Sequence, residues 1–258
     1  MKLTKDAAAY ALITGASKGI GREIAFRLAK KGNNLILVAR NLDDLEKISA
    51  KLEKTYNVKI FNISADLCKD TAAEEIYKQC IENNLAVNML INNAGAATFG
   101  RFDKIDIKKQ LNTIKLNVNS LIELTYYFIP ELKKHSNSFI LNVSSIVSLY
   151  PVPYFSVYAA SKAFVLSFTK ALMYELKKTT IKVSCLCPGD TDTGFFNTAG
   201  LNGVKASFMK PETVAKIAVK KLLKNKAVIF PKNVKIIAKI PKPLLKRIVA
   251  SRVSKYVD

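Results

Sequence analysis

Short apolar runs alternate with longer segments of helical periodicity along almost the whole chain. Helical patterns fill the gaps between the apolar runs, and the longest of them cover Lys104–Lys134 and Val157–Lys178. Strands that alternate with helices form a parallel sheet covered on both faces. The pattern therefore predicts a doubly wound α/β fold, with residues 1–258 in one domain. The runs that we expect to be its strands are Tyr10–Thr14, Leu35–Ala39, Lys59–Ile63, Val87–Ile91, Ser138–Val143, Lys182–Leu186 and Ala227–Phe230.

Composition agrees with a soluble domain of this class. The chain has 258 residues, 49% of them hydrophobic, which suffices for one large core. No apolar run reaches the roughly 18 residues of a membrane span, and the first residues lack the pattern of a secretory signal. Cys185 and Cys187 alternate within one predicted strand, on the same side, and read as buried thiols. We expect a cytoplasmic protein without a metal site.

The first predicted strand runs into a glycine-rich turn, Gly15-Ala16-Ser17-Lys18-Gly19-Ile20-Gly21. The segment from Gly21 to Lys31 then has the pattern of an amphipathic helix. Unpaired N–H groups at a helix N-terminus, together with glycines that permit close approach, form a phosphate site. The spacing differs from the commoner dinucleotide fingerprint, and a turn that binds nothing is the alternative. The residues predicted to hold a dinucleotide here are Gly15, Ser17, Lys18, Gly19, Ile20 and Gly21.

Tyr158 and Lys162 stand four residues apart in a predicted helix, so they share one face. A free tyrosine has a pKa of about 10, and a nearby cation favours its phenolate. Ser145, thirteen residues before Tyr158, offers a hydroxyl to the oxygen that gains or loses the proton. Ser144 is the alternative serine. A half-buried tyrosine beside a solvated lysine is the alternative to a proton-transfer site.

Several of these residues converge at one edge of the predicted sheet. Gly15, Asn93, Ser145 and Pro188 each follow an apolar run directly. Ligands of such sheets bind beyond the carboxyl ends of the strands. The pattern therefore predicts a single site at that edge.

Taken together, these motifs resemble the short-chain dehydrogenase/reductase family, in its branch of about 250 residues with a Rossmann-type sheet. The resemblance covers nearly the whole chain. It implies that Asn117, Ser145, Tyr158 and Lys162 are catalytic, with Lys162 also on the nicotinamide ribose and Asn117 anchoring a water. It also implies homodimers or homotetramers. The matching motifs, which add cofactor contacts, are Thr14-Gly15-x3-Gly19-x-Gly21, Asn92-Asn93-Ala94-Gly95, Asn117, Ser145 with Tyr158 and Lys162, and Pro188-Gly189 followed by Thr193.

Basic residues near the predicted second strand favour NADP(H) over NAD(H). Arg40 ends that strand where an acidic residue would select NAD, and a cation there pairs with a 2′-phosphate. Lys18 adds a second positive charge, although both are ordinary surface cations in the alternative interpretation. Asp66 and Leu67 match the adenine-contacting pair of the family, and Asp66 as a helix cap is the alternative.

Aromatic residues flank the predicted catalytic edge. Tyr150 and Tyr154 lie between Ser145 and Tyr158, and Phe195 with Phe196 follows Pro188-Gly189. In the family these segments form the substrate pocket, which implies an apolar substrate such as a fatty acyl, sterol-like or aromatic ketone or aldehyde. Packing in the core or at an interface is the alternative.

The net charge of +21 is concentrated near the C-terminus. The tail 232–258 mixes Lys and Arg with apolar residues at helical spacing, and Pro231, Pro241 and Pro243 break it. Three interpretations of this tail stay open. It packs as a helix with its lysines solvated, it contacts a membrane surface peripherally, or it docks an acidic partner. No nucleic-acid motif accompanies the charge. The sequence thus predicts an NADP(H)-dependent oxidoreductase; the alternative is a catalytically idle dinucleotide-binding regulator or scaffold with a partner- or membrane-binding tail.

Overall fold

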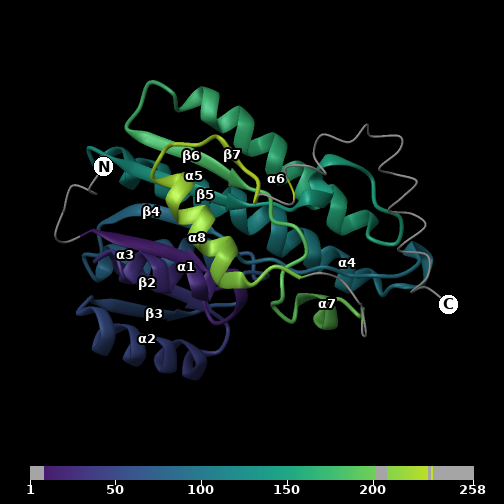
Figure 1. Cartoon of the computed structure of the whole chain (residues 1–258), viewed down its shortest axis with the longest axis horizontal. Coiled ribbons are helices and arrows are strands. Elements are labelled where there is room, and N and C mark those ends of the chain that lie inside the picture. The colour runs from purple at the N-terminus through teal and green to yellow at the C-terminus, as the bar shows by residue number, and fades with distance from the viewer. Residues whose placement is uncertain (1–8, 202–207, 232–233, 235–258) are drawn as a thin grey trace.

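Seven parallel strands form one sheet in the order β3-β2-β1-β4-β5-β6-β7 (Figure 1). The computed structural model describes residues 9–201, 208–231 and 234, so the tail considered above lies, except for Val234, outside the described residues. The strand order turns back at β1 and β4, as in a doubly wound sheet, and confirms the predicted fold class. The strands are β1 (Tyr10–Thr14), β2 (Asn34–Ala39), β3 (Ile60–Ser64), β4 (Val87–Asn92), β5 (Ser138–Val143), β6 (Ile181–Leu186) and β7 (Val228–Ile229).

Helices cover both faces of the sheet. On one face, α1 (Gly19–Ala29), α2 (Leu42–Tyr56) and α8 (Pro211–Leu222) bury their apolar sides in a common core. On the other, α3 (Ala72–Glu82), α5 (Ser120–Lys133) and α6 (Ser156–Glu175) build a second core. Because the strands are covered on both sides, they read as continuous apolar runs.

The predicted helix Lys104–Lys134 is interrupted. It consists of a 3₁₀ turn η1 (Phe102–Lys104), α4 (Ile107–Ile114), a π turn η2 (Lys115–Asn119) and then α5. Asp106 starts α4, since its side chain accepts hydrogen bonds from the N–H groups of Lys108 and Lys109. Pro130 lies inside the last turn of α5, which continues to Lys133.

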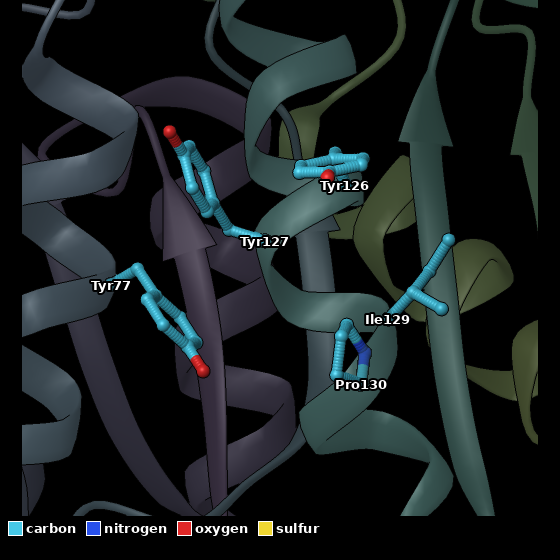
Figure 2. A pocket seen from close by; sticks show the side chains of 5 residues that line it. All are labelled: Tyr77, Tyr126, Tyr127, Ile129 and Pro130. Atoms are coloured by element: carbon cyan, nitrogen blue, oxygen red, sulfur yellow. The ribbon is translucent and has the colours of Figure 1, made fainter.

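A shallow hollow of about 310 Å³ lies between α3 and α5 (Figure 2). Tyr77 of α3 and Tyr127 of α5 stack across it, with ring centroids 5.8 Å apart. It lies on the half of α5 that is remote from the carboxyl ends of the strands. Among the described residues, no helix is both long and apolar enough to cross a bilayer.

Candidate active site

Hydrogen bonds tie the glycine-rich turn to the end of β4. The N–H groups of Asn93 and Ala94 both donate to Thr14 Oγ1, at 3.0 Å each. Asn93 Nδ2 donates to the carbonyl oxygens of Thr14 and Gly15, at 2.9 and 3.2 Å. The turn and the residues after β4 therefore form one rigid unit at the sheet edge. Thr14 is central to it, and its role was visible only as part of the family motif.

The turn has the shape of a phosphate cradle. Gly15 and Gly19 adopt positive φ angles of 64° and 58°. A Cβ atom on Gly21 would lie 2.3 Å from the Gly15 carbonyl oxygen, so no larger residue fits there. Lys18 occupies the N-cap position of α1 without a side-chain cap, which leaves the first N–H groups of the helix without a side-chain partner. These features fit a dinucleotide pyrophosphate. Thr193 lies beside the same turn, because its Cβ is 3.0 Å from where a Cβ on Gly19 would stand.

Arg40 and Asp66 meet at the ends of β2 and β3. Both line a cavity of about 330 Å³, together with Lys69, which no sequence motif indicated. Asp66 Oδ1 accepts a hydrogen bond from the Cys68 N–H at 3.1 Å, and the cap of α3 is Thr71, so Asp66 caps a turn instead of that helix. Leu67 packs into the core beneath.

The predicted cation of the turn does not join this cavity. Lys18 is exposed at the start of α1 and is not among the lining residues. Lys69 is thus the second basic residue that lines this cavity with Arg40. The expectation that Lys18 contacts the same phosphate stays a prediction.

Lys162 lies buried under the sheet edge, 4% exposed. Its ammonium donates to the carbonyl oxygen of Val143 at 2.9 Å, and its own carbonyl accepts from Ser144 Oγ at 2.7 Å. The Ser144 hydroxyl is therefore bound to a backbone carbonyl, and Ser145 is the better candidate for a hydroxyl that contacts a substrate oxygen. Burial lowers the pKa of Lys162 to about 8, since the charged form loses hydration.

Asn117 lies next to Lys162, in the π turn before α5. Its Oδ1 accepts from the N–H of Ala96, and its Nδ2 donates to the Ala96 carbonyl, at 2.9 Å each. Nδ2 also donates to Ser161 Oγ, whose hydroxyl donates in turn to the Tyr158 carbonyl. A Cβ on Gly95 would stand 3.1 Å from Lys162 Nζ and 3.2 Å from Asn117 Oδ1. Because Gly95 has no side chain, Lys162 Nζ and Asn117 Oδ1 can both lie close to its backbone.

Tyr158 is buried on the same helix face, and Lys162 Nζ lies 5.9 Å from the centroid of its ring. Burial raises the pKa of Tyr158 to about 12, while the Ser145 hydroxyl pulls it down and the charge of Asp190 adds to the rise. The sequence led us to expect a pKa lowered by Lys162. In this structure burial outweighs the other influences, because aromatic side chains enclose the phenol.

Two phenylalanines enclose Tyr158. The ring centroids of Phe155 and Phe195 lie 5.8 and 5.4 Å from that of Tyr158. Tyr150 belongs to the same apolar cluster, whereas the ring of Tyr154 packs on Phe99, 6.3 Å away. The side chain of Phe196 lies outside the described residues. Of the predicted pocket residues, Tyr150 and Phe195 thus belong to the cluster around the phenol, together with Phe99, Phe155 and Val234.

Val234 also covers the Pro188-Gly189 motif. A Cβ on Gly189 would stand 2.7 Å from Val234 Cγ2. The carbonyl oxygen of Pro188 accepts a hydrogen bond from the N–H of Ile146, next to Ser145, at 2.8 Å. The motif is therefore held against the segment that follows β5. Behind it, the thiols of Cys185 and Cys187 lie 3.9 Å apart, on one side of β6 as predicted.

Comparisons with known proteins agree on one family. The model of the short chain dehydrogenase family matches residues 9–202. Human 17-beta-hydroxysteroid dehydrogenase type 3 is 33% identical over 211 residues, which are 78% of this chain and 66% of that protein. Rat very-long-chain 3-oxoacyl-CoA reductase is 33% identical over 218 residues, 82% of this chain and 67% of the relative. The chain thus spans about two thirds of the length of these curated relatives.

A solved structure matches more of its own length. It is a short-chain dehydrogenase from Sphingobium yanoikuyae in complex with NADPH, with 28% sequence identity and a TM-score of 0.81. The alignment covers 90% of this chain and 96% of that one.

Proposed function

This chain belongs to the short-chain dehydrogenase family, and on that premise we propose that it is an NADP(H)-dependent oxidoreductase acting on a carbonyl or alcohol group. The observation that carries the proposal is the convergence of Asn117, Ser145, Tyr158 and Lys162 beside the glycine-rich turn. These residues come from three segments of the chain, and the hydrogen bonds of Asn117 and Lys162 hold them in one place.

Each side chain has a role that its surroundings support. When bound, NADP(H) supplies the hydride chemistry. Tyr158, whose raised pKa keeps the phenol protonated at neutral pH, gives a proton to the carbonyl oxygen in reduction. Ser145 hydrogen-bonds and orients that oxygen. Lys162 holds the cofactor ribose and provides a positive charge near the phenol, and Asn117 connects Lys162 to a water for reprotonation.

Arg40 and Lys69 support a preference for NADP(H). Both line the cavity at the ends of β2 and β3, where an acidic residue would accept ribose hydroxyls. Guanidinium and ammonium groups pair with phosphate oxygens. Asp66, in the same cavity, is the acceptor that we propose for the adenine end.

The substrate that we propose is apolar. Phe155, Phe195 and Tyr150 form the enclosure of the catalytic phenol. The two curated relatives are named for a hydroxysteroid and for a very-long-chain 3-oxoacyl-CoA, and in both compounds the carbonyl or alcohol group is carried on a large apolar skeleton or chain. Phe195 contacts the catalytic ring directly, so a substrate displaces it on entry.

We also propose that the protein self-associates as a homodimer or homotetramer through α5 and α6, which are neighbours on one face of the sheet. The outer sides of these two helices expose three large apolar side chains, Ile122, Tyr126 and Phe164. Such exposure indicates an interface in a chain that carries 41 Lys and Arg residues. Tyr126, on α5 in Figure 2, is 74% exposed. Sedimentation velocity of the protein and of Tyr126→Glu tests this, since a charge at such an interface disfavours association.

An assay of cofactor oxidation tests the activity. NADPH and NADH are each supplied with 3-oxoacyl thioesters of graded chain length, steroid ketones and aromatic aldehydes. We expect turnover with NADPH that rises with the apolar area of the substrate. Better turnover with NADH would contradict the cofactor assignment. Cofactor binding without turnover of any compound would favour a dinucleotide-binding regulator.

A further inference from the structure

Three large apolar side chains are more than half exposed on the short segment that follows the active-site strand β4. They are Phe102 (61%), Ile107 (59%) and Leu111 (55%). Ile107 and Leu111 are four residues apart on α4 and share a face. Gln110 Nε2 donates to the carbonyl oxygens of Phe102 and Ile105, at 3.1 and 3.2 Å, and so holds η1 against α4. Residues 101–111 therefore form one surface, which we call the η1–α4 surface.

Single exposed apolar residues are ordinary on a protein surface, whereas a cluster marks a binding surface. The described part of the chain exposes nine large apolar side chains, and three of them fall within these eleven residues. No other stretch of similar length has three. The clustering of exposed apolar side chains on the η1–α4 surface therefore indicates a binding surface.

Cations surround these apolar side chains. Arg101, Lys104, Lys108 and Lys109 are all exposed on the same surface. Its two acids are bound within the surface itself: Asp103 pairs with Arg101 at 3.2 Å, and Asp106 accepts hydrogen bonds from the first N–H groups of α4. Within the part of the chain that the structure describes, Lys104, Lys108 and Lys109 form no ion pair.

The η1–α4 surface adjoins the enclosure of the catalytic phenol. The chain reaches it from Phe99, whose ring lies 4.9 Å from that of Phe155. The Gly100 N–H donates to the Tyr154 carbonyl, and the Phe99 N–H donates to the Ala199 carbonyl. Figure 1 shows α4 and α7 (Phe195–Thr198) at the same end of the molecule, toward which β1 points.

We propose that the η1–α4 surface binds the face of an anionic lipid bilayer. Phe102, Ile107 and Leu111 enter the headgroup region, and the surrounding Lys and Arg side chains contact lipid phosphates and carboxylates. Apolar residues interleaved with cations are the composition of helices that lie in a membrane interface. A second copy of the chain is a poorer occupant of this surface, because a symmetric contact would bring the exposed Lys104, Lys108 and Lys109 of one copy close to the same lysines of the other.

Binding at this surface turns the aromatic enclosure toward the bilayer. If the substrate is apolar, as proposed above, this orientation lets it pass from the lipid to Tyr158 with little exposure to water. Only this consequence rests on the proposed function. The binding itself follows from the exposed residues and their charges.

Flotation of the full chain with vesicles tests the proposal. Vesicles of phosphatidylcholine alone and of phosphatidylcholine mixed with phosphatidylserine are compared, without substrate. We expect the protein to bind the anionic vesicles, with binding weakened by salt. The variant Phe102→Ser/Ile107→Ser/Leu111→Ser should lower the partition coefficient at least about tenfold, because it removes the apolar contacts. A second variant, Lys104→Gln/Lys108→Gln/Lys109→Gln, leaves the apolar residues in place. It should lower binding to the anionic vesicles and leave binding to phosphatidylcholine vesicles unchanged.

A matched control comes from the opposite end of the molecule. Ile81 (46% exposed) and Tyr174 (71% exposed) lie near the C-terminal ends of α3 and α6, and Ile81→Ser/Tyr174→Ser should partition like the unmodified protein. Failure of the unmodified protein to bind anionic vesicles would overturn the proposal. So would equal binding by the unmodified protein and both η1–α4 variants, which is the result expected if the tail alone binds lipid. A control variant that loses as much binding as the apolar variant would also refute it.

Discussion

The ammonium nitrogen of Lys162 donates a hydrogen bond to the carbonyl oxygen of Val143, 2.9 Å away, at the carboxyl end of β5. This bond places a buried charge in contact with the sheet edge. A single carbonyl does not replace the hydration that the ammonium loses, and burial therefore lowers the pKa of Lys162 to about 8.

The lowered pKa of Lys162 predicts how stability changes with pH. At pH 7 the folded and the unfolded states both hold this proton. Above pH 8 the folded state releases it, while the unfolded chain keeps it until about 10.5, so the unfolded state binds more protons in this window. The free energy of unfolding, relative to Lys162→Met, should therefore rise between pH 8 and 10 by about 1.4 kcal/mol per pH unit at most.

Urea denaturation of both proteins at several pH values measures this difference, in which the titration of other groups cancels. Lys170, exposed on the same helix, provides the control Lys170→Met. A difference between the protein and Lys162→Met that stays constant from pH 7 to 10 would show that Lys162 is not buried in its charged form.

Removal of one oxygen from Tyr158 should separate catalysis from binding. Tyr158→Phe keeps the ring between Phe155 and Phe195 but removes the group that exchanges the proton. We expect kcat to fall by about a hundred- to ten-thousand-fold, the range for loss of a general acid. NADPH affinity, measured by fluorescence titration, should change little. Tyr77→Phe, at the hollow in Figure 2, is the control and should keep full activity. Retention of most activity by Tyr158→Phe would exclude the proposed role.

A methyl group on Gly21 should disrupt the cofactor turn. The added Cβ would lie 2.3 Å from the Gly15 oxygen and 2.4 Å from Asn93 Nδ2, so the turn or the end of β4 must move. Gly21→Ala should weaken NADPH binding at least about tenfold, because phosphate recognition depends on the position of backbone N–H groups. Gly32→Ala, at an uncrowded glycine with φ of 80°, should lose some stability and keep NADPH affinity. Equal affinity losses in both variants would indicate a general effect on folding.

The sheet and the glycine-rich turn were predictable because their signals are local. Apolar runs of strand length and glycines at a turn encode β1 and its turn without knowledge of the rest of the fold. The interruption of the predicted helix Lys104–Lys134 was not predictable in this way. The π turn around Asn117 is stabilised by bonds to Ala96 and Ser161, which are 21 and 44 residues away in the chain.

The electrostatics of the site also depend on distant contacts. The spacing of Tyr158 and Lys162 correctly indicates a shared helix face, but the direction of the pKa shift of Tyr158 follows from its burial. That burial comes partly from Phe195, which lies 37 positions further along the sequence. Lys69 was missed for a related reason, since only the pairing of β2 with β3 brings it near Arg40.

Arg40 should determine the choice between the two dinucleotides. It follows β2 and lines the cavity with Lys69 and Asp66. A charge-assisted hydrogen bond to a 2′-phosphate is worth about 1.5–3 kcal/mol. Arg40→Ser should therefore raise the KM for NADPH about ten- to hundredfold and leave that for NADH nearly unchanged. Lys69→Ser should shift the KM for NADPH in the same direction, and Lys30→Ser, at the far end of α1, should have no effect. If Arg40→Ser impaired both cofactors equally, Arg40 would stabilise the turn instead of recognising the phosphate, and the preference for NADPH would need another source.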